Sequence, residues 1–190
     1  MDNKETEAIY NQAFNGLSFF YRDTDLSEKL ISKYKVGQIL KERGFTDMSY
    51  KAGGLVSSLR YLIASANARD VSSVNPDGAK FGHVILKSNA FFKVLDIYTI
   101  GDRTQIFLLE IPETAVELFS ATTSNIENDI IKKARENFET NIRILPVAVL
   151  QSEAWKEGTE FPIGMSTKGV FFLDEDNNTG TATKPWWKFW

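Results

Sequence analysis

The clearest pattern of hydrophobic positions predicts a β-hairpin in the middle of the chain. Two runs rich in β-branched and aromatic residues, 83–98 and 104–111, flank the pair Gly101-Asp102. Glycine at the first position of a two-residue loop is typical of a type II′ turn. That turn sets the register of the two strands and predicts the pairs Ile97–Ile106, Leu95–Leu108 and Lys93–Glu110. Opposite charges in the last pair agree with this register.

Helical periodicity is strongest between residues 124 and 140. Apolar residues recur there at every fourth position, namely Ile126, Ile130, Ala134 and Phe138. Ser124 to Glu127 has the spacing of a capping box, which favours a helix start at this point. Weaker patterns predict three more helices, over 5–20, 25–43 and 113–121.

Three other segments are candidate strands. Residues 55–68 fit either a strand or a buried helix, and alternation around Tyr61 and Ile63 favours a strand covered on both faces. Residues 142–150 fit an edge strand because Pro146 cannot donate to a sheet. A last short strand is predicted over 168–173.

The character of the chain changes after Leu173. Residues 174–183 include one alanine and no larger apolar residue, so they predict a flexible acidic and polar linker. Residues 184–190 then hold three of the four tryptophans. We therefore expect one α+β domain over 1–173, with an antiparallel or mixed sheet built around a central hairpin at about 84–111 and helices packed on it, followed by a flexible tail.

Composition narrows the function classes. A formal net charge of −3 gives no general attraction to phosphate backbones, so no nucleic-acid partner is predicted. The absence of cysteine excludes disulfides and thiolate chemistry and fits a reducing cytoplasm. No signal peptide and no spanning helix is evident, so we expect a cytoplasmic, bacterial protein with no membrane partner.

Residues 184–190, called the aromatic tag below, are the most unusual stretch of the sequence. Four rings gather at its end, those of Trp186, Trp187, Phe189 and Trp190. Such rings are favoured anchors in protein interfaces, so we expect the tag to bind a protein partner. Docking of the tag on its own domain and binding at a bilayer interface remain open alternatives.

Candidate chemistry is sparse. His83 is the only histidine, and general-base use would need a carboxylate or a nucleophile beside it, neither of which any spacing implies. Arg60, Arg69 and Asp70 cluster around the end of the 55–68 segment and are a tentative anion-binding group. Asp96 lies inside an apolar strand, where a carboxylate needs a partner. No catalytic residue, metal site or cofactor is predicted, since no phosphate-loop or metal-ligand spacing is present.

Two functions follow from these features. The first is a non-enzymatic binding or adaptor protein that attaches to a larger assembly through its tag. The alternative is a small enzyme that acts on an anionic substrate, with a site near Arg60, Arg69, Asp70 and His83.

Overall fold

A computed structural model describes residues 4, 8–9, 13–121 and 125–180 of the chain. Its centre is a mixed sheet of eight strands in the order β2-β7-β8-β4-β1-β3-β6-β5. The strands are β1 (Ser18–Thr24), β2 (Ile39–Glu42), β3 (Thr46–Ser49), β4 (Leu59–Ser65), β5 (Arg69–Asp70), β6 (His83–Leu86), β7 (Ala90–Ile100) and β8 (Arg103–Ile111). The expected mixed sheet with packed helices is confirmed, but the sheet is larger than a single hairpin.

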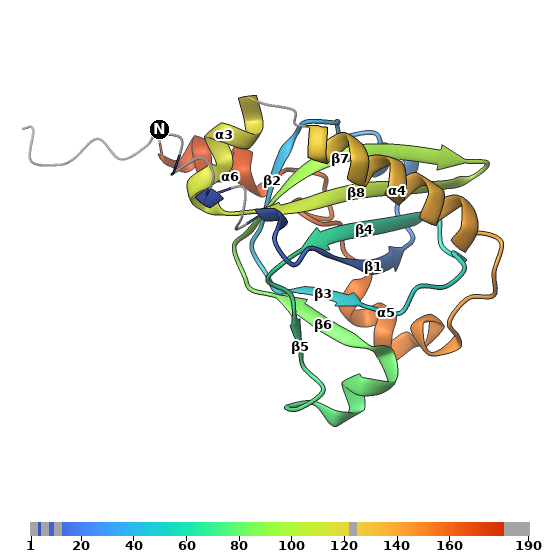
Figure 1. Cartoon of the computed structure of the whole chain (residues 1–190). Helices are drawn as coiled ribbons and strands as arrows, with labels where there is room; N and C mark the ends of the chain where they lie inside the picture. The colour runs from blue at the N-terminus through green and yellow to red at the C-terminus, as the bar shows by residue number, and fades with distance from the viewer. Residues whose placement is uncertain (1–3, 5–7, 10–12, 122–124, 181–190) are drawn as a thin grey trace, which may run out of the picture.

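Strands β4 and β1 occupy the middle of the sheet, where the hairpin was expected. Strand β4 pairs in parallel with β8 and antiparallel with β1, and all seven of its residues are buried. This confirms the expectation of a strand covered on both faces. Only Tyr21 and Ser49 join β1 to β3, so the sheet narrows there, and β3, β6 and β5 lie below β1 in Figure 1.

The hairpin forms with the expected turn but not with the expected register throughout. Gly101 has a φ of 62° and Ile97 pairs with Ile106, as predicted. A bulge between Val94 and Asp96 then shifts the pairing by one residue. The bulge adds one residue to β7 that has no partner on β8. The residues of the turn, from which the register was predicted, carry no sign of this extra residue. The predicted pairs Leu95–Leu108 and Lys93–Glu110 are therefore wrong, because Leu108 pairs with Val94 and Glu110 pairs with Phe92.

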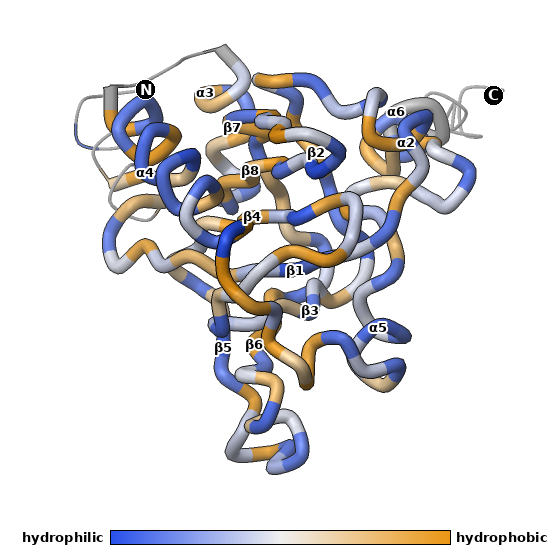
Figure 2. Tube along the Cα trace, turned by 90° about the vertical axis from the view of Figure 1, so that its right-hand side faces the viewer, coloured by the Kyte–Doolittle hydropathy of each residue, from blue (hydrophilic) through white to orange (hydrophobic). Residues whose placement is uncertain are grey.

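Helices cover both faces of the sheet. They are α2 (Glu28–Ile31), α3 (Val116–Ala121), α4 (Asn125–Asn141), α5 (Glu153–Thr159) and α6 (Phe172–Gly180), with 3-10 turns η1 (Pro76–Phe81), η2 (Glu113–Ala115) and η3 (Ala148–Gln151). Helix α4 contacts β7 and β8, whereas α5 contacts β1 and β3 (Figure 1). Hydrophobic stretches along β4 and β8 (Figure 2) contribute to two buried clusters, one toward α3 and α4 and one toward the 163–165 segment.

Several predicted elements differ. The predicted helix over 25–43 is a short α2, turns and then β2, because β2 gains a ladder with β7 and Gly37 adopts a φ of 84°. Such tertiary pairing overrides local propensity. Residues 18–20 belong to β1 instead of a helix, and the predicted strand over 142–150 is irregular chain that leads into η3. The predicted strand over 168–173 is reduced to one bridge between Phe171 and Met165, and α6 begins at Phe172.

The start of the predicted linker is helical. Residues 174–180 lie in α6, where Asp176 accepts hydrogen bonds from Lys41 at 2.7 Å and from Arg43 at 2.6 Å. These two basic residues hold the pKa of the Asp176 carboxyl below its usual range. The aromatic tag lies outside the described residues. Among the described residues, no helix is long and apolar enough to cross a membrane.

Candidate active site

Three neighbouring strands bring titratable side chains together beneath α5. Strand β3 pairs with β1 on one side and with β6 on the other, in a register that places Ser49 opposite His83 and Asp47 opposite Ile85. Arg22 of β1, Asp47 of β3 and His83 of β6 thereby line one region of the sheet that α5 covers.

His83 has the carboxylate partner that the sequence did not show. Its Nε2 lies 2.8 Å from Oδ1 of Asp47, and the two side chains keep 18% and 31% of their surface exposed. Trp155 of α5 contacts the imidazole edge-on, with ring centroids 5.5 Å apart. A partly exposed imidazole whose orientation a carboxylate fixes is one arrangement that suits general acid–base catalysis.

Arg22 is held by peptide carbonyls. Its Nε donates to the oxygen of Thr159 at 3.1 Å and its Nη2 donates to the oxygen of Phe161 at 2.8 Å. The side chain is only 5% exposed, and this burial lowers the pKa of Arg22. An arginine still remains charged at neutral pH. Among the described residues, no ion pair joins Arg22 to an acidic side chain, although the charges of Glu42 and Asp47 act to raise its pKa.

Two cavities adjoin at this place. The larger, of about 430 Å³, is lined by Arg22, Glu42 and Asp47 together with residues of the segment 158–167. The smaller, of about 150 Å³, is lined by His83, Trp155 and again Asp47. Because Asp47 and Gly158 border both cavities, the arginine and the histidine face parts of one divided cleft.

The structure separates the residues of the predicted anion-binding group. Arg69 pairs with Ile85, as Asp47 does, so Arg69 lies on the Asp47 face of the sheet, whereas Asp70 pairs with Val84 and lies on the other face. Arg60 is buried and bound through two hydrogen bonds of 2.7 Å to Asp23. Asp96 has its partner in Arg135 of α4, at 2.8 and 2.7 Å.

Arg22 and Asp47 were missed by the sequence analysis. Arg22 follows three aromatic residues, in Phe-Phe-Tyr-Arg-Asp-Thr, and a charge inside such an apolar run is a usable signal. Asp47 carries no comparable signal, because only strand pairing brings it to His83. Within the described residues, no three histidine or acidic side chains gather in a way that could hold a metal ion.

No family model and no curated protein sequence matches the chain. Solved structures similar to it include the Vis toxin of Vibrio splendidus, an ADP-ribosyltransferase (18% identity, 53% of this chain and 51% of that chain, TM-score 0.42). Others are the ADP-ribosyltransferase HopU1 of Pseudomonas syringae (14%, 50% and 46%, TM-score 0.44) and Exoenzyme S of Pseudomonas aeruginosa bound to carba-NAD (13%, 66% and 62%, TM-score 0.45). The chain spans about half the length of the first two.

These similarities correct the first functional expectation. The interpretation of the chain as a non-enzymatic adaptor is corrected here: several of the similar structures are named as ADP-ribosyltransferases, which are enzymes. Trp186, Trp187, Phe189 and Trp190, on which that interpretation depended, lie outside the described residues.

Proposed function

We propose that the chain is an enzyme that acts on an anionic substrate in the divided cleft beneath α5. The observation that carries the proposal is the hydrogen bond between His83 and Asp47, which orients an imidazole at the wall of a cavity. In this role His83 accepts a proton from the attacking group and Asp47 fixes the ring. Arg22 binds the negative charge of the substrate in the larger cavity.

NAD is the first substrate to test. It is an anionic dinucleotide, so its phosphates suit the charge of Arg22, and carba-NAD is the ligand named for Exoenzyme S. ADP-ribosyl transfer, the activity named for the Vis toxin and for HopU1, defines the assay. The measurement is the NAD-dependent labelling of acceptor proteins, together with release of nicotinamide.

Three variants separate the roles. His83→Ala should lower the rate by about a hundredfold or more, because it removes the general base. Asp47→Asn should lower it less, since the ring remains but loses its carboxylate. Asp77→Asn is the matched control, because Asp77 lines the same small cavity and has no hydrogen bond to His83 among those of the described structure. An unchanged rate in His83→Ala would contradict the proposal.

A binding measurement tests whether the cleft holds an anion even if NAD is not turned over. Since the sequence has one histidine, its ring protons give a single pair of NMR signals. Addition of NAD or inorganic phosphate should shift these signals in the wild-type protein and leave them in place in Arg22→Gln. If the protein neither turns over NAD nor shows any such shift, the cleft is not an anion site.

A further inference from the structure

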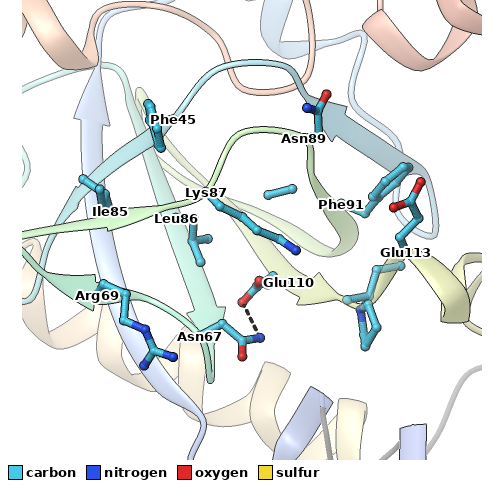
Figure 3. A pocket seen from close by; sticks show the side chains of 13 residues that line it. Phe45, Asn67, Arg69, Ile85, Leu86, Lys87, Asn89, Phe91, Glu110 and Glu113 are labelled. Atoms are coloured by element: carbon cyan, nitrogen blue, oxygen red, sulfur yellow. Dashed lines mark hydrogen bonds between the residues drawn. The ribbon is translucent and has the colours of Figure 1, made fainter.

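Another cavity, which shares only Phe45 with the cleft beneath α5, is lined by charges of both signs. It measures about 370 Å³ and lies where the ends of β4, β6 and β8 meet the start of β7 (Figure 3). Its volume falls in the range of small-molecule sites. Two acidic and two basic side chains line it, namely Glu110, Glu113, Arg69 and Lys87. The cavity is therefore neutral as a whole but carries separated charges of both signs.

Glu110 places a buried carboxylate at this cavity. The side chain is 7% exposed, and both of its hydrogen bonds, from the hydroxyl of Ser65 and from the amide of Asn67 at 3.2 Å, end on Oε2. The bulge in the hairpin directs Lys93 to Glu127 instead, at 3.0 Å. Within the described residues, no lysine or arginine forms an ion pair with Glu110. A buried carboxylate that only neutral donors contact favours a cation beside it.

The basic side chains lie at the rim. Lys87 and Arg69 are exposed, and neither forms an ion pair in the part of the chain that the structure describes. In Figure 3 the Lys87 side chain extends toward the middle of the view, where Glu110 lies, while Asn67 lies below Glu110 and Arg69 lies to their left. These two cations suit a carboxylate on the same ligand.

The remaining wall is apolar. Phe91, Leu86 and Ile111 line the cavity between the charged groups, and Phe91 is 7% exposed. We propose that this cavity binds a free α-amino acid with an apolar side chain. The ammonium group contacts Glu110, the carboxylate contacts Lys87 and Arg69, and the side chain packs on the apolar wall. This site is independent of the chemistry proposed for His83.

Charge-truncated analogues test the proposal. The probes are L-leucine, L-leucinamide, which lacks the carboxylate, and 4-methylpentanoate, which lacks the ammonium group, and calorimetry or ligand-observed NMR measures their binding. Leucine should bind at least about tenfold more tightly than either analogue, because each analogue loses one charge-assisted contact. Absence of leucine binding, or equal binding of the three probes, would overturn the proposal.

Variants identify the contacts. Glu110→Gln and Lys87→Ala should each weaken leucine binding by about tenfold, and Lys132→Ala, an exposed position on α4, should not change it. If Glu110→Gln does not fold, Asn67→Ala takes its place. Asn67 is exposed and donates a hydrogen bond to the Glu110 carboxylate, so its loss should also weaken leucine binding. Tighter leucine binding in Lys87→Ala would show that Lys87 itself is the counter-ion of Glu110, and the proposal would then be wrong.

Discussion

Arg60 and Arg22 lie on the two adjacent central strands but have different partners. Arg60, which is 1% exposed, forms two hydrogen bonds with Asp23, its register partner on β1, and a third with the carbonyl of Gly53 at 2.9 Å. Arg22 instead donates hydrogen bonds to the carbonyls of Thr159 and Phe161, and the charges of Glu42 and Asp47 act on it without an ion pair in the described chain. Arg60 is therefore a structural residue, whereas Arg22 keeps the position in the cleft on which the proposed anion binding depends.

Removal of the Arg60 partner should be costly. Asp23→Ala leaves a buried guanidinium without its carboxylate, which costs about 3–5 kcal/mol of unfolding free energy. The midpoint of guanidinium chloride unfolding measures this loss. Asp102→Ala changes an exposed carboxylate in the hairpin turn and serves as the control. Equal midpoints for the two variants would mean that the buried pair contributes nothing.

Two glycines make a matched pair for a backbone test. Gly164 has a φ of 79°, and a Cβ there would lie 2.8 Å from Cβ of Leu40, whereas a Cβ at Gly158 in α5 would meet no atom within 4 Å. Gly164→Ala should therefore cost more than about 1 kcal/mol. Gly158→Ala should be neutral or stabilise the protein by up to about 1 kcal/mol, because alanine favours helix. Urea unfolding of both variants is the measurement, and an equal effect on both would contradict the argument.

At the scale of elements, α5 is the cover of the candidate active site. Trp155 is 6% exposed, stacks on Phe81 at 5.3 Å and contacts His83, while Thr24 of β1 donates to the carbonyl of Glu160 at 3.0 Å. The segment thus closes the cleft by contacts with both β1 and β6. Access to His83 depends on how firmly this element is held.

Loss of the tryptophan should open the cleft. Trp155→Ala removes the ring over His83, so diethyl pyrocarbonate should modify the imidazole several-fold faster than in the wild-type protein. Because the sequence has one histidine, the absorbance change reports that site alone. Trp155→Phe keeps an aromatic ring and should show a smaller increase. Identical modification rates in the wild-type protein and Trp155→Ala would show that α5 does not shield the site.

At the scale of the whole molecule, a buried tyrosine pair connects three distant segments. The hydroxyl oxygens of Tyr34 and Tyr61 are 2.6 Å apart, and Tyr34 donates to the carbonyl of Ile163 at 2.7 Å. Burial raises the pKa of Tyr34 well above its usual value, and it raises the pKa of Tyr61 to about 12. The pair therefore couples the α2 region, the central strand and the segment that follows α5.

This pair should make stability fall in alkali. Below pH 10 both tyrosines are neutral in the folded and unfolded chains, and between pH 10 and about 12 only the unfolded chain ionises Tyr61. The unfolding free energy should therefore drop across this window, by about 3 kcal/mol from Tyr61 alone. Denaturant unfolding at several pH values measures the slope. The double variant Tyr34→Phe/Tyr61→Phe should show a flatter slope, and an unchanged slope would refute this origin.

The sequence by itself determined the elements whose signals are local. Gly101 makes the hairpin turn, and the four-residue apolar repeat makes α4. In each case, side chains within one turn or one strand decide the backbone. The presence of His83 as the single imidazole was equally plain.

Only the tertiary structure decided which strands and side chains those elements contact. The bulge in β7, the conversion of residues 39–42 to strand and the pairing of Asp47 with His83 all depend on partners distant in sequence. A hydrogen-bond ladder or a salt bridge between distant segments carries no periodic signal in either segment. For this reason the sequence supplied the candidate histidine, whereas the fold supplied its carboxylate, the arginine beside the cleft and the helix that covers them.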